Sequence, residues 1–346
     1  MKHIFWVILI VLLLSPQCFA EEFTAPTVPS AGSYIFPEEP ESFTDGLISI
    51  LSDALTLIRP AIVEAAKVCS SLIAVTLLIS ICTNIHGASA RVIQLVSAFS
   101  IAGLLLQSSK IMIQLAADTV VELSEYGKLL FPILTAAVAS QGGTSTSVAL
   151  YVGTAAFDAI LCALIKSLIV PMLYLYICLA IAHAAVEQDF LKRFRDNVKW
   201  VMTWILKTVL YIFVGYMSIT GVISGTTDAA ALKAAKLTIS SFVPVVGGIL
   251  SDASEAILVG AGVVKSTTGI YGLLAIISVL IGPFITIGAQ YIVLKLTGFV
   301  CSAFDSKGSN ELIENFSTAM GFLLAVTGSV CLLLIVGAVC FMKGVG

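Results

Sequence analysis

Six ionisable side chains lie close together between Ser224 and Lys265, in a chain that is otherwise mostly apolar. They are Asp228, Lys233, Lys236, Asp252, Glu255 and Lys265. An ionisable group at membrane depth is costly, and by default it indicates an ion or proton site. Asp252 and Glu255 are three residues apart, so they share a face if the segment is helical. The acids predict either a cation or proton site or, more commonly, ordinary capping of a helix start at the membrane interface.

The same stretch contains residues that interrupt helices. Pro244 lacks a backbone donor, and Gly247 and Gly248 allow backbone angles that a helix does not use. Only fifteen residues separate Lys236 from Asp252. At about 1.5 Å per residue they are too short to cross a hydrocarbon core of roughly 30 Å. We therefore expect broken or re-entrant helices over 224–265, packed inside a bundle. The candidate functional residues are Asp228, Pro244, Gly247, Gly248, Asp252, Glu255 and Lys265.

The sequence offers little support for catalysis. Val264 stands before Lys265, where a phosphate-binding loop requires glycine. The chain has three histidines, and neither a His-Glu-x-x-His nor a Gly-x-Ser-x-Gly motif occurs. Its eight cysteines form no Cys-x-x-Cys pair, which favours apolar packing roles over metal or disulfide roles. We expect no enzyme activity, no cofactor and no metal.

The composition is that of a polytopic membrane protein. Hydrophobic residues make up 58% of the chain and charged residues only 11%, whereas a soluble domain carries about 25% charged residues. The net charge of −3 argues against nucleic acid as a partner, because nucleic-acid binding requires a basic patch. Long uncharged runs predict five to seven spans in an all-α transmembrane helical bundle with the lipid bilayer around it.

Three regions are expected along the chain. Residues 1–20 resemble a cleavable signal peptide, with Lys2 before an apolar core and small residues before a cleavage point after Ala20. An uncleaved anchor helix is the alternative. Residues 21–60 form an acidic extracytoplasmic leader, since 21–58 carry seven acids and no Lys or Arg. Residues 61–346 form the membrane domain.

Within the membrane domain several segments leave two interpretations open. Residues 110–128 are amphipathic and predict an interfacial helix. Residues 128–158 predict either half-helices meeting at a buried loop or two short spans joined by a surface turn. Gly282-Pro283 lies inside a long uncharged run that is either one kinked span or a tight hairpin.

One basic cluster indicates the orientation of the chain. The cluster consists of Lys192, Arg193, Arg195 and Lys199. By the positive-inside rule it is cytoplasmic. Phe190 and Phe194 interleave with these charges, so we expect it to lie on the membrane surface, with docking of a cytoplasmic partner as the alternative. Small residues recur in the spans and suit a compact bundle or a homo-oligomer.

The central stretch resembles the stage III sporulation protein AE family of endospore-forming bacteria. The resemblance rests on Ser224 to Asp228, on Phe242-Val243-Pro244-Val245-Val246-Gly247-Gly248, on Ser251-Asp252-Ala253 and on Lys265 to Gly272. The order of spans is also similar, and the resemblance covers most of the mature chain.

The resemblance implies a function that composition does not show. It implies an integral subunit of a channel-like or secretion-like complex in the mother-cell membrane around the forespore. The implied partners are other stage III sporulation membrane proteins, a cytoplasmic ATPase and a forespore protein. The complex would support late forespore gene expression. The alternative is a stand-alone secondary transporter with an ionisable site at Asp228, Asp252 and Glu255.

Overall fold

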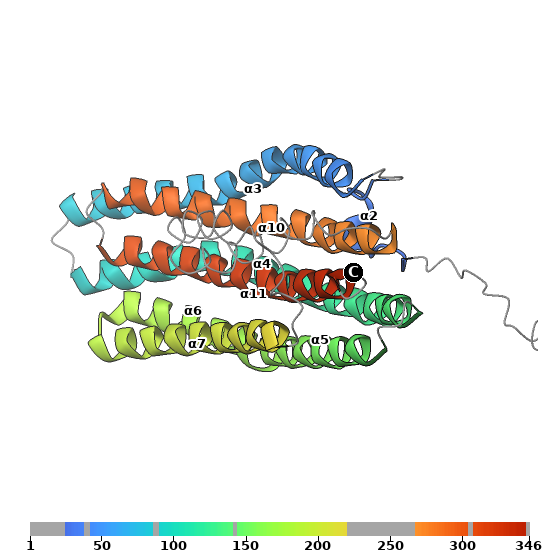
Figure 1. Ribbon diagram of the computed structural model, residues 1–346. Coiled ribbons are helices and arrows are strands. Elements are labelled where there is room, and N and C mark those ends of the chain that lie inside the picture. The colour runs from blue at the N-terminus through green and yellow to red at the C-terminus, as the bar shows by residue number, and fades with distance from the viewer. Residues whose placement is uncertain are drawn as a thin grey trace, which may run out of the picture.

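Helices make up every regular element that the structure describes. The computed structural model describes residues 25–37, 42–85, 90–140, 144–219, 267–303 and 307–343, and no strand occurs among them. The helices are α2 (Ser30–Ser33), α3 (Phe43–Ile85), α4 (Ala90–Ser140), α5 (Thr144–Leu164), the π-helix η1 (Ile165–Ile169), α6 (Val170–Val186), α7 (Asp189–Ile219), α10 (Thr267–Ser302) and α11 (Lys307–Lys343). They form one elongated bundle (Figure 1).

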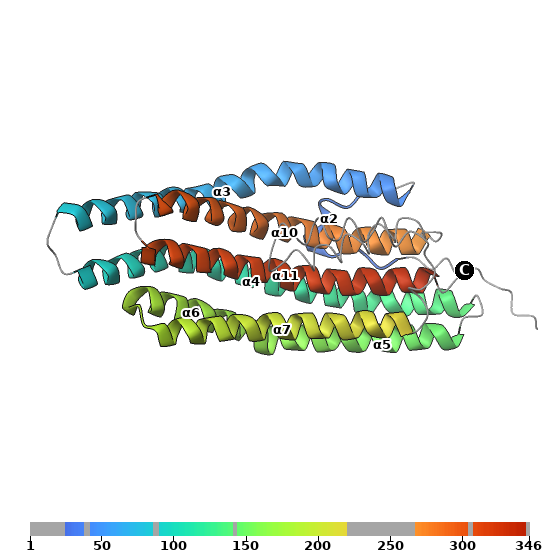
Figure 2. The ribbon, with the colours of Figure 1, turned by 60° about the vertical axis from the view of Figure 1, so that its left-hand side comes forward.

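Six helices are long and apolar enough to cross a membrane, when α5, η1 and α6 are counted as one continuous helix. This number, taken over the described residues, lies within the predicted five to seven. All six run side by side along the bundle (Figures 1 and 2). The all-α fold class is therefore confirmed.

Helix α11 is the core of the bundle. It carries no charged residue between Glu314 and Lys343, and a helix that is apolar all round is one that is buried all round. In its most apolar window 94% of the residues are buried, compared with 22% in the window of α3. It packs against α4, α5, α6, α7 and α10. The surrounding helices therefore provide the outer, lipid-facing surface.

Some helices are longer than a bilayer requires. Helix α3 has 43 residues and α4 has 51, which corresponds to about 65 Å and 77 Å at 1.5 Å per residue. A hydrocarbon core is about 30 Å thick. The prediction of a separate interfacial helix at 110–128 was therefore wrong, because this segment is the middle of the continuous α4. Lys110, Asp118, Glu125 and Lys128 are exposed and Glu122 is half-buried, whereas apolar residues of the same segment, such as Val120 and Leu123, are buried in the bundle.

Other open alternatives are resolved by helix continuity. Helix α10 runs through Pro283 without a break, so this segment is one span. Helix α4 continues to Ser140, and α5 starts at Thr144 and packs against it, so two separate helices flank residues 141–143, which lie outside the described residues. Helix α3 runs through Pro60, so the expected boundary between leader and membrane domain falls inside a helix. The predicted signal peptide at 1–20 and the broken stretch 224–265 lie outside the described residues.

Close packing of small residues holds the core together. A Cβ atom added at Gly337 would lie 2.6 Å from Thr154 Cγ2 of α5. A Cβ atom at Gly272 would lie 2.7 Å from Leu130 Cδ1 of α4. Association of helices in lipid depends on packing of this kind, since no water is released between them.

The helices alternate in direction. The end of α6 and the start of α7 lie at the same end of the bundle as the end of α10 and the start of α11 (Figures 1 and 2). The hydrogen bond from Gln94 Nε2 to the Ala184 carbonyl, at 3.2 Å, places the start of α4 there too. We call this the α6–α7 end. The end of α4 and the start of α5 lie at the opposite end, which we call the α4–α5 end.

Candidate functional site: a buried polar network at the α6–α7 end

A buried guanidinium is the centre of the polar network at the α6–α7 end. Arg195, in the second turn of α7, is only 5% exposed. Its Nη1 donates to Glu311 Oε1 of α11 at 2.9 Å. Its Nε and Nη2 donate to Asp196 Oδ1 at 3.0 and 2.9 Å. Because a buried charge must be paired to be tolerated, these two carboxylates allow Arg195 to point into the bundle.

The α6–α7 turn positions this arginine. Helix α6 ends at Val186, and the next residue, Glu187, has a left-handed backbone conformation with φ of 52°. The Glu187 N–H donates to the His183 carbonyl at 2.7 Å, which closes the last turn of α6. The Leu191 N–H then donates to the Gln188 carbonyl at 3.0 Å. The chain thus reverses within a few residues, and α7 is held against α6.

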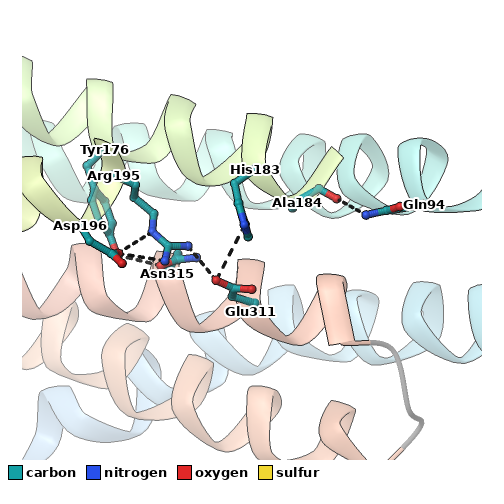
Figure 3. A network of polar contacts seen from close by, with 8 residues as sticks. All are labelled: Gln94, Tyr176, His183, Ala184, Arg195, Asp196, Glu311 and Asn315. Carbon is teal, nitrogen blue, oxygen red and sulfur yellow. Dashed lines mark hydrogen bonds and ion pairs between the residues drawn. The ribbon is translucent and has the colours of Figure 1, made fainter. Parts of the chain in front are cut away.

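A histidine and a tyrosine of α6 extend the network. His183 Nδ1 lies 3.8 Å from Glu311 Oε1. One turn further along α11, Asn315 Oδ1 accepts a hydrogen bond of 2.9 Å from the buried Tyr176 hydroxyl. Glu311 and Asn315 are four residues apart and share a face of α11. That face therefore meets α6 and α7 together (Figure 3).

Helix α4 joins the network from its other side. In addition to the Gln94 contact with α6, Ser97 Oγ lies 2.6 Å from Ser309 Oγ of α11, and either can donate. Four helices are thus linked by polar contacts at one end of the bundle. Lipid cannot compete for these groups, so the contacts fix the relative register of the helices as well as their packing.

The network has the chemistry of a structural junction and contains no recognisable catalytic arrangement. It holds one permanent cation, Arg195, and two carboxylates, Glu311 and Asp196. Among the described residues no group of three or more His, Cys, Asp or Glu side chains could hold a metal ion. The arrangement binds α7 to α11 through Arg195 and Glu311.

The predicted basic cluster divides in the structure. Lys192 and Arg193 are exposed and Lys199 is half-buried, and their position at the membrane surface stays a prediction. Arg195 points inward instead. The sequence did not predict the ion pairs of Arg195 with Glu311 and Asp196. A signal was present, because Glu311 and Asn315 are polar residues at helical spacing where α11 becomes apolar.

The other predicted site residues do not bear on this network. Asp228, Pro244, Gly247, Gly248, Asp252, Glu255 and Lys265 all lie outside the described residues. Their role in an ion or proton site stays a prediction.

Comparison with known proteins gives two matches. Residues 42–344 match the family model described as stage III sporulation protein AE. The chain is also 24% identical, over 237 residues, to the stage III sporulation protein AE of Bacillus subtilis strain 168. That alignment covers 66% of this chain and 58% of the relative. No solved structure matches the chain significantly.

Proposed function

Because the chain belongs to the stage III sporulation protein AE family, we propose that it is an integral membrane subunit of a sporulation-specific complex between mother cell and forespore. The matched residues, 42–344, include all six apolar helices of the described structure. The conclusion rests on this match across the whole bundle. Family membership also implies association with other sporulation proteins.

The subunit acts as a platform or channel component rather than as an enzyme. The described structure provides a packed helical bundle, and its buried polar groups connect helices to one another. A cytoplasmic ATPase and a forespore membrane protein are its proposed partners. The complex supports late gene expression in the forespore.

The orientation of the bundle follows from its charges. The α6–α7 end carries exposed Lys192 and Arg193, and basic residues next to spans favour the cytoplasmic side. The acidic leader precedes α3, which begins at the opposite end. We therefore place the α6–α7 end in the mother-cell cytoplasm, where a cytoplasmic ATPase can reach it. The opposite end lies toward the forespore.

The test is complementation in an endospore-forming host that lacks its own family member and carries a late, forespore-specific transcriptional reporter. We expect the reporter to stay silent after engulfment in the deletion strain. Expression of this chain in the mother cell should restore it, and expression only in the forespore should not. Normal reporter activity and heat-resistant spores in the deletion strain would contradict the proposal.

A vesicle assay separates this role from that of an autonomous transporter. A subunit that depends on partners gives no ion flux above that of empty vesicles when it is reconstituted alone. Flux from the purified chain, lost in Asp252→Asn at equal protein content, would contradict the platform role. It would support a transport site in the stretch 224–265.

A further inference from the structure

A second buried polar group lies away from the network at the α6–α7 end, between α4 and α5. Asp158 of α5 is 3% exposed. The Ser124 hydroxyl of α4 donates to its Oδ2 at 2.6 Å. Its other oxygen, Oδ1, is buried and has no hydrogen-bond partner among the described residues. Asp158 is therefore a half-satisfied carboxyl in the interior of the bundle.

No cation among the described residues pairs with this carboxyl. The ion pairs in the described part of the chain do not include Asp158. On the neighbouring elements, Lys128 of α4, Lys166 of η1 and Lys207 of α7 all expose their side chains. Helix α11 has no charged residue from Asn315 to Met342. The site therefore differs from that of Arg195, where every charge has a partner.

The polar groups around Asp158 are neutral. Cys162, one turn further along α5, has its Sγ 3.8 Å from the Val120 carbonyl of α4. Thr154, one turn earlier, has a buried hydroxyl without a partner among the described residues. Residues 154, 158 and 162 recur every four positions, so they form one polar stripe on the buried side of α5. An anion in this stripe would have no cation among the described residues in contact with it, and of these residues only the exposed Lys128 of α4 would attract it from a distance.

The backbone next to this stripe is irregular. The α-helix gives way to the π-helix Ile165–Ile169 two turns after Asp158. Single π turns inside long helices are rare, and they occur frequently at functional sites. This feature is independent of the carboxyl, and it lies on the same helix.

We propose that Asp158 is a proton-binding site, in which a proton occupies the Oδ1 oxygen while Ser124 donates to Oδ2. An uncharged acid leaves only one polar atom without a partner, whereas a carboxylate would leave a charge in the interior that no cation of the described structure contacts. Sodium fits less well, because a cation needs more oxygen ligands than Asp158 and Ser124 provide. Asp158 lies outside the stretch 224–265 in the sequence, and the proposal does not depend on the sporulation role.

The experiment is labelling of the purified full chain, in anionic phospholipid vesicles, with a membrane-soluble carbodiimide. The reagent takes up the carboxyl proton as the carboxylate oxygen adds to its central carbon, and the O-acylisourea rearranges to a stable N-acylurea. The reaction therefore needs an acid that is protonated and shielded from water. Peptide mass spectrometry locates the adduct. The pH is varied from about 6 to about 9, and the protonated fraction falls about tenfold per unit above its midpoint.

We expect an adduct at Asp158 near neutral pH that decreases as the pH rises. It should be absent in Asp158→Asn and unchanged in Asp118→Asn, which alters an exposed carboxylate of α4 held by Gln114 Nε2 at 2.8 Å. No adduct at Asp158 at any pH, with lipid-soluble reagent in excess, would overturn the proposal. Less labelling in sodium chloride than in choline chloride of equal concentration would also overturn it, in favour of a sodium site. Equal labelling of Asp158 in the two salts would support a site that binds a proton and not sodium.

Discussion

Arg195 Nη1 of α7 lies 2.9 Å from Glu311 Oε1 of α11, and the two residues are separated by 116 positions in the sequence. The arginine is buried, while the side chain of Glu311 is 36% exposed. This pair links the basic turn at the α6–α7 end to the most deeply buried helix of the bundle. It is a charge-assisted contact between two segments that are distant in the sequence, and such contacts are stronger than hydrogen bonds between neutral groups.

Removing Glu311 should destabilise the bundle more than removing a surface acid. In Glu311→Ala, the buried Arg195 keeps only Asp196 as a partner, and loss of one member of a buried pair costs about 3 kcal/mol. Glu314→Ala is the matched control. Its pair with Lys295 has side chains 59% and 42% exposed, and such pairs contribute less than about 1 kcal/mol. Denaturant unfolding of the detergent-solubilised protein measures both, and equal losses would contradict a structural role for the pair.

The hydroxyl of Tyr176 should matter although the residue is mostly apolar. Tyr176→Phe leaves the buried Asn315 without its donor, which should lower the free energy of unfolding by about 1–2 kcal/mol. Tyr174→Phe, at an exposed position two residues away, should change it by less than about 0.5 kcal/mol. The same unfolding measurement applies. A null effect of Tyr176→Phe would mean that water or another side chain satisfies Asn315.

Sequence reasoning predicted the class of fold and most of the helices, because long apolar runs between charges directly report membrane-spanning helices. It did not predict that the Arg195 side chain is buried inside the bundle. Arg195 is in one basic cluster with Lys192 and Arg193, and only the rotation of α7 and the distant Glu311 decide which of them is buried. The single span through Pro283 was also ambiguous, since a proline in a membrane helix is tolerated once neighbouring helices pack around it.

Two glycines of the bundle should respond in opposite directions to alanine. Gly337→Ala places a Cβ 2.6 Å from Thr154 Cγ2 and 3.2 Å from the Phe131 ring, and overpacking of this kind costs about 1–3 kcal/mol. Gly103→Ala meets nothing within 4 Å and should stabilise α4 by about 0.5–1 kcal/mol. Thermal unfolding of the two variants tests this. A stabilised Gly337→Ala would mean that α5 and α11 are less closely packed than the structure shows.

Asp158 should tolerate a neutral isostere better than a smaller residue. If the carboxyl is protonated, Asp158→Asn keeps an uncharged polar group opposite Ser124 and should cost less than about 1 kcal/mol. Asp158→Ala leaves Ser124 unpaired and opens a cavity, at a cost of about 2 kcal/mol. Unfolding at neutral pH compares the two. A loss in Asp158→Asn as large as in Asp158→Ala would indicate that the negative charge itself is required.

The orientation of the bundle can be tested with single cysteines at its two ends. We expect Gln188→Cys, in the α6–α7 turn, to react with a membrane-impermeant thiol reagent only after the membrane is opened, because the exposed Lys192 and Arg193 keep that end in the cytoplasm. Ser33→Cys, at the last residue of α2, should react in intact, non-sporulating cells that express the chain. Ser33 belongs to the acidic leader, and α2 lies toward the end of the bundle opposite the α6–α7 end (Figures 1 and 2). Both variants require a background in which the exposed Cys82 and Cys178 are replaced by alanine. Reversed accessibility would invert the topology, and a cytoplasmic partner would then have to dock at the α4–α5 end, where no basic cluster occurs among the described residues.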